Sequence, residues 1–113
     1  MPCPFPETMT TDRYILVDGK PVQEPDLYKW ASWIGNSKDR FIKSTIIGDT
    51  KISTVFLGLD HRYIGEGMPI LFESMCFGGE LDQEMERYTS LEDAKRGHSL
   101  MCQKVRSHLD NPK

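Results

Sequence analysis

Asp60 and His61 stand directly after the apolar run of residues 52–59, and two further carboxylates, Glu66 and Glu73, follow. A histidine beside a carboxylate can act as a general base, because the carboxylate fixes its tautomer. Asp60, His61 and Glu73 are therefore the candidate catalytic residues of a small hydrolase or nuclease-like enzyme. Neighbours on a strand point to opposite faces, so Asp60 and His61 need not touch. Ionisable residues at strand ends are common in domains without activity, and a structural role is favoured.

Glu73 is the one carboxylate inside the second apolar run, residues 70–77. A charge among apolar neighbours is costly unless it is paired. Arg87, on the strand expected next, is the predicted partner across the hairpin. An ion pair is favoured over ligand binding, and either role makes Glu73 important.

His98 and Cys102 have the i, i+4 spacing of two metal ligands on one helical turn, and Cys76 and His61 would complete a tetrahedral zinc set. Both helical residues, however, lie on an apolar stripe, where histidine and free cysteine commonly pack without a metal. No second spaced pair supports the set, so neither a metal nor another cofactor is expected.

The charge, motifs and cysteine content of the whole chain disfavour several classes of binding partner. The net charge is -3 and the basic residues are scattered, which disfavours duplex nucleic acid, although a mononucleotide needs only one or two cations. The sequence has no P-loop, dinucleotide fingerprint or nucleophile elbow. No apolar run approaches the roughly 20 residues of a membrane span, and no secretion signal is recognised. Three cysteines without a C-x-x-C pair indicate a reducing cytoplasm.

The elements follow from hydrophobic periodicity and turn residues. Helices are expected from Pro25-Asp26 to Gly35-Asn36 and, after the capping box at Ser90, to Leu109. Strands are expected at residues 13–17, 41–47, 51–59, 70–77 and in the second half of 80–88. The run at 51–59 is apolar on both alternating faces, which predicts cover on two sides by helices or by a second subunit.

Two residues on the expected helices have a specific interpretation. Trp33 lies on the flank of the first helix stripe, so packing is favoured and contact with a partner is the alternative. Gly97, inside the second helix, costs about 1 kcal/mol relative to alanine, which indicates close approach of a strand or a partner there.

The predicted fold class is α+β: an antiparallel meander sheet of four to five strands with two helices packed on it. Residues 13–109 form the single domain, with a mobile tail at 1–12 and a short tail at 110–113.

Four runs, YILVDGKPVQEPDLYKWASWI, TIIGDTKISTVFLGLDH, GMPILFESMCFGG and ERYTSLEDAKRGH, resemble a family of small phage and prophage proteins whose members carry no assigned activity. The resemblance extends from Arg13 to about Val105. It implies a phage accessory protein acting in the bacterial cytoplasm, and it transfers no catalytic role to any residue.

The expected function is non-enzymatic binding by a homodimer that counteracts host defence. The target is a host protein or a small nucleotide-like ligand, and the enzyme that uses Asp60, His61 and Glu73 is the alternative. Leu100, like Trp33, is a candidate exposed apolar contact. The candidate binding residues are His61, Glu73, Arg87, His98 and Trp33.

Overall fold

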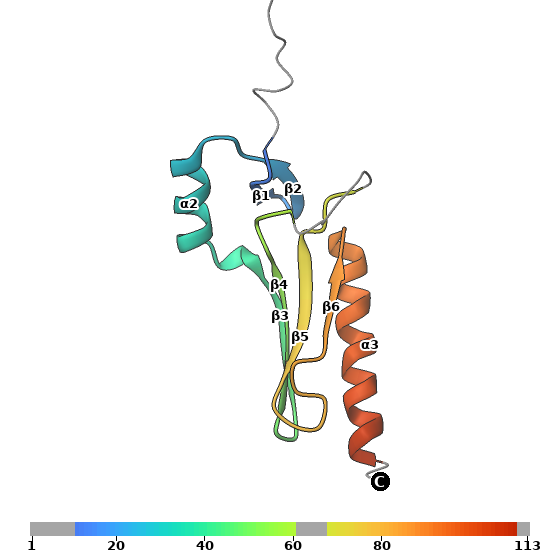
Figure 1. Ribbon diagram of the computed structural model, residues 1–113. Coiled ribbons are helices and arrows are strands. Elements are labelled where there is room, and N and C mark those ends of the chain that lie inside the picture. Colours follow the sequence, from blue (N-terminus) through green and yellow to red (C-terminus); the bar gives the residue numbers. More distant parts are fainter. Residues whose placement is uncertain (1–10, 61–67, 111–113) are drawn as a thin grey trace, which may run out of the picture.

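The computed structural model describes residues 11–60 and 68–110 (Figure 1). His61 and most of the two predicted tails lie outside these residues. The elements, in chain order, are β1 (Tyr14–Val17), β2 (Lys20–Gln23), α2 (Leu27–Asn36), a 3-10 turn (Lys38–Arg40), β3 (Phe41–Ile47), β4 (Thr50–Phe56), β5 (Phe72–Phe77), β6 (Met85–Tyr88) and α3 (Leu91–Asp110).

Strands β3, β4, β5 and β6 form one antiparallel sheet in chain order, so the predicted α+β meander is confirmed. β1 and β2 form a separate hairpin, closed by Asp18 and Gly19 at positive φ of 53° and 80°. The sequence did not predict β2, because Pro21 indicated a turn. A proline is compatible with a strand at a sheet edge, where its missing N–H leaves no ladder bond unmade.

Helix α3 lies along one face of the meander and contacts all four of its strands. The buried side chains between them form two clusters. One contains Phe56, Phe72 and Ala94, with Leu16 and Leu71, and the other contains Ile52, Cys76, Met101, Cys102 and Val105. Alternate residues of β4 and β5 thus face the apolar stripe of α3, as the period of two requires.

Helix α2 and the β1–β2 hairpin lie together at one end of the meander (Figure 1). The helix begins as predicted, since Asp26 accepts hydrogen bonds from the amides of Tyr28 and Lys29. The indole Nε1 of Trp30 donates to the carbonyl oxygen of Gly58 at 2.9 Å, which ties α2 to the chain just beyond β4.

The predicted cover on both faces of the central strand is wrong within a single chain. Thr50, Ile52, Thr54 and Phe56 of β4 are buried, but Lys51 is exposed and Ser53 and Val55 are only half-buried. The reason is the position of α2, which packs at the end of the sheet instead of on its second face. We call this second face of the meander the open face.

Within residues 11–60 and 68–110, no helix has both the length and the apolar character to cross a membrane.

Candidate functional site

His98 lies at the centre of a buried chain of hydroxyl groups between α3 and the sheet. Its Nε2 is 2.8 Å from Thr45 Oγ1 and its Nδ1 is 2.6 Å from Thr54 Oγ1, which also bonds the hydroxyl of Ser74. The side chain is 1% exposed. Burial, and to a lesser extent the charge of Lys43, lowers the pKa of His98, so the ring is neutral at pH 7.

This position changes the role expected of His98. Both ring nitrogens contact threonine hydroxyl groups, so neither is available to bind a metal ion. The buried ring is also not accessible to a partner protein. A satisfied buried network of this kind instead holds α3 in one register on the sheet.

A pH dependence of stability follows from this histidine. In the unfolded chain His98 titrates near its ordinary pKa of 6.5, whereas burial lowers its pKa in the folded protein. The unfolded state therefore binds more protons below that pH, and the stability contributed by neutral His98 is complete above it and is lost as the pH falls toward the lowered folded value.

Urea unfolding at about pH 7.5 and about pH 5 measures this effect. We expect a smaller fall in unfolding free energy for the variant His98→Gln, which keeps hydrogen-bonding groups but does not titrate. Equal falls in the two proteins would assign the acid sensitivity to other groups.

The cysteines of the zinc hypothesis, Cys76 and Cys102, are buried free thiols. Burial is the main cause that raises the pKa of Cys76, which favours the neutral thiol over the metal-binding thiolate. No group of three or more potential metal ligands occurs within the part of the chain that the structure describes.

Asp60 lies just after the end of β4, where its Oδ1 accepts a hydrogen bond from the amide of Ile70 at 2.9 Å. Its own amide donates to the carbonyl oxygen of Asp12 at 2.9 Å. These bonds connect the two ends of the segment between β4 and β5 and the segment before β1. They give Asp60 a structural role, and the position of His61 beside it lies outside the described residues.

Glu73 and Arg87 form the predicted ion pair across the β5–β6 hairpin, with Nε and Oε2 at 3.1 Å. The pair lies on the open face, because Glu73 is opposite the half-buried Val55, whereas His98 lies on the α3 side. The sheet therefore separates His98 from Glu73 and Arg87. These three candidates do not converge on one site.

Trp33 packs against the core, with its ring edge-on to Phe56 at a centroid distance of 5.6 Å. The favoured interpretation of packing is thus confirmed.

The open face carries an apolar surface that none of the candidate residues indicated. The register places its residues in three rows, and the apolar members are Phe41 and Val55, Met75 and Met85, and Ile46 and Phe77. Ile46 is 73% exposed and Phe77 47%. The same rows also contain Ser44, Ser53, Lys51, Glu73 and Arg87. Antiparallel sheets with one solvated face normally carry mainly polar residues there, so six large apolar side chains on this face mark it as a candidate interaction surface.

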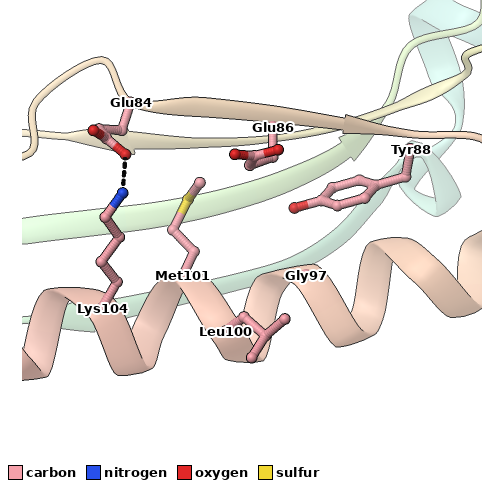
Figure 2. Close-up of a pocket in the computed structure, with 7 residues that line it drawn as sticks. All are labelled: Glu84, Glu86, Tyr88, Gly97, Leu100, Met101 and Lys104. Atoms are coloured by element: carbon pink, nitrogen blue, oxygen red, sulfur yellow. Dashed lines mark hydrogen bonds and ion pairs between the residues drawn. The ribbon is translucent and has the colours of Figure 1, made fainter.

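A second feature is a groove between β6 and α3, with a volume of about 200 Å³. Figure 2 shows Glu84, Glu86 and Tyr88 along the strand, facing residues of α3. The α3 residues are Gly97, Leu100, Met101 and Lys104. We call it the Tyr88 groove. Of its residues the sequence singled out Gly97 and Leu100, and Gly97 was the signal for close approach.

Gly97 lies directly under the ring of Tyr88. An added Cβ would be 2.2 Å from the Tyr88 hydroxyl oxygen, far inside contact distance. The predicted close approach of a strand at this turn is therefore confirmed.

Comparisons of the chain with protein-family models, with curated proteins and with solved structures find no match.

Proposed function

We propose that this chain is a non-enzymatic phage accessory protein of the bacterial cytoplasm. It dimerises through its open face and binds a host protein, so that it counteracts host defence. The apolar open face is the observation that carries the proposal. The phage setting rests on the family resemblance.

The size of the open face supports a second copy as its occupant. Four strands about 4.8 Å apart, each about six residues long at a rise of about 3.4 Å, give a plan area of roughly 400 Å². Side chains raise the accessible area above that, so two such faces approach the roughly 1,000 Å² that a specific interface requires. Two antiparallel sheets pack face to face readily, about 10 Å apart.

The charges of the open face also favour a second copy. Glu73 and Arg87 already neutralise each other, so two copies meet without an unpaired carboxylate between them. Lys51, the remaining cation, is one residue from the turn that joins β3 and β4. Its long stem lets the ammonium group reach water at the rim.

A host protein is a better target than a nucleotide-like ligand. The described hollow that contains two lysines, Lys38 and Lys95, has a volume of about 390 Å³ and also contains Asp18 and Asp39. The opposite charges cancel, which weakens attraction for phosphate. The enzyme alternative has less support, because Asp60 and Glu73 each have a structural partner.

Sedimentation equilibrium tests the dimer. We expect the wild type to sediment with twice the 13.0 kDa mass of the chain at micromolar concentration. The double variant Ile46→Lys with Phe77→Lys places two cations on the open face and should be monomeric, since unpaired like charges oppose association.

The matched control is Leu100→Lys, at a residue that is 57% exposed on α3. It should remain dimeric, and circular dichroism checks that each variant is folded. A monomeric wild type, or a dimer that only the Leu100 variant dissociates, contradicts the proposed interface.

A further inference from the structure

Strand β3 forms one edge of the four-stranded sheet. It pairs with β4 along one side, and no strand among the described residues lies along its other side. With seven residues it is longer than β6, the four-residue strand at the opposite edge. An edge of this length presents a row of unpaired backbone N–H and C=O groups, to which another extended chain can add.

The outward backbone groups of β3 belong to Ser44 and Ile46. The two-residue turn Gly48-Asp49 joins the directly opposed residues Ile47 and Thr50, which form a pair of the hydrogen-bonded kind. Bonded and non-bonded pairs alternate along an antiparallel ladder, so the backbone groups of Ser44 and Ile46 face away from β4. Both residues are exposed, and their amides are therefore accessible to a partner.

The side chains of β3 divide between the two faces of the sheet. Lys43 is directly opposite Thr54, whose hydroxyl bonds His98, so Lys43 lies on the α3 side. Burial lowers the pKa of His98 and the charge of Lys43 lowers it further, so the lysine lies close to this ring. Ser44 and Ile46 lie on the open face. An added strand therefore has one row of side chains beside a lysine and the other beside an isoleucine.

The charge of this edge is positive. From Arg40 to Ile47 the chain contains two cations, Arg40 and Lys43, and no carboxylate. Neither cation forms an ion pair with another described residue. Opposite charges on paired strands are stabilising and like charges are destabilising. The edge therefore favours an acidic strand, and it disfavours β3 of a second copy, which would bring its own cations.

We propose that β3 binds an extended acidic segment of a partner polypeptide by antiparallel strand addition. Ser44 and Ile46 exchange backbone hydrogen bonds with the added strand, and its carboxylates lie on the α3 side beside Lys43. Its alternate, apolar side chains lie beside Ile46. The inference rests on the proposed function only in taking the target to be a protein. Two sheets packed face to face leave their strand edges open, so the edge is available in a monomer and in a dimer.

An amide NMR titration of the full chain with the pentapeptide N-acetyl-valyl-glutamyl-valyl-glutamyl-valinamide tests the site. We expect saturable shifts at Lys43, Ser44 and Ile46, and slower hydrogen exchange of the two outward amides. The peptide with lysine in place of both glutamates has the opposite charge, and it should bind at least about fivefold more weakly. Equal binding of the two peptides, saturable shifts confined to β6, or no saturable shift overturns the proposal.

N-methylation of the peptide tests the backbone pairing. Directly opposed residues of an antiparallel pair have side chains on the same face, so the central valine directs its amide toward β3 and the glutamate amides point away. A methyl group on the central valine amide should weaken binding by about tenfold or more. The same group on the second glutamate amide should weaken it by less than about threefold. Equal losses for the two methylated peptides overturn strand addition.

Two variants of the chain test the charge. Lys43→Gln should weaken the glutamate peptide by about threefold or more, whereas Lys104→Gln, at an exposed residue that pairs with Glu84 on the β6 side of α3, should not. Equal effects of the two variants overturn the role of Lys43.

Sedimentation at the NMR concentration without peptide tests a second copy as the occupant of the edge. A series of species larger than the proposed dimer would assign the edge to further copies of this chain and overturn the acidic partner. The titration reads β3 whether the chain is a monomer or a dimer, so its failure is distinguishable from failure of the proposed dimer.

Discussion

Replacing His98 by alanine is expected to lower the free energy of unfolding by roughly 3 kcal/mol or more. The ring is 1% exposed, so its removal leaves a cavity between α3 and the sheet. It also takes a hydrogen-bond partner from Thr45 and from Thr54, whose hydroxyls lie at 2.8 and 2.6 Å from the ring nitrogens. Marginal stabilities of about 5–15 kcal/mol make this a severe loss. Urea unfolding followed by circular dichroism measures it.

The matched control is His108→Ala, on the same helix. His108 is exposed, and its Nδ1 lies 3.3 Å from the Lys104 carbonyl oxygen. Its replacement should change stability by less than about 0.5 kcal/mol. A loss for His98→Ala no larger than this control would show that the buried network does not hold α3 on the sheet.

Gly97→Ala is expected to destabilise the protein by about 1–3 kcal/mol, although alanine is the better helix former. The added Cβ would be 2.2 Å from the Tyr88 hydroxyl oxygen and 2.3 Å from its Cε1, so the ring must move. The displaced ring disturbs the packing of β6 on α3. Thermal or urea unfolding gives the change.

Gly35→Ala provides the contrast within α2, because a Cβ at that position meets nothing within 4 Å. It should be neutral or stabilising by up to about 1 kcal/mol. A double-mutant cycle of Gly97→Ala with Tyr88→Leu should show positive coupling, since the smaller side chain relieves the overlap. If Gly97→Ala stabilises the protein as Gly35→Ala does, the close packing of Tyr88 on α3 is wrong.

The sequence predicted most of the elements because their signals are local. The Pro25-Asp26 start and the Ser90 capping box place the two helices. The turn glycines place the hairpins of the meander. The Glu73–Arg87 ion pair could also be predicted from the sequence, because a charged residue in an apolar strand requires a partner on the neighbouring strand.

The position of α2 could not be predicted from such local signals. It depends on long-range contacts such as that of the Trp30 indole with the Gly58 carbonyl oxygen, which no periodicity encodes. The same limit applies to the network around His98. Thr45, Thr54 and Ser74 have ordinary strand propensities, and only the register of three strands brings them to one histidine.

The Tyr88 groove was indicated by Gly97 alone. A glycine within a helix signals close approach, but it does not say which side chain approaches. Pairing of β5 with β6 places Tyr88 opposite Phe72, on the α3 side of the sheet. The register of β5 and β6 therefore identifies Tyr88 as the side chain that approaches Gly97.

Two chains are proposed to associate through the open face. Isotope-filtered NOE spectra of labelled chains mixed with unlabelled chains test it most directly, because they report only contacts between chains. We expect intermolecular contacts from the side chains of Val55, Met75 and Met85, and none from Met101 in the core beneath α3. Intermolecular contacts confined to α3, or none from the open face of a dimer, would contradict it.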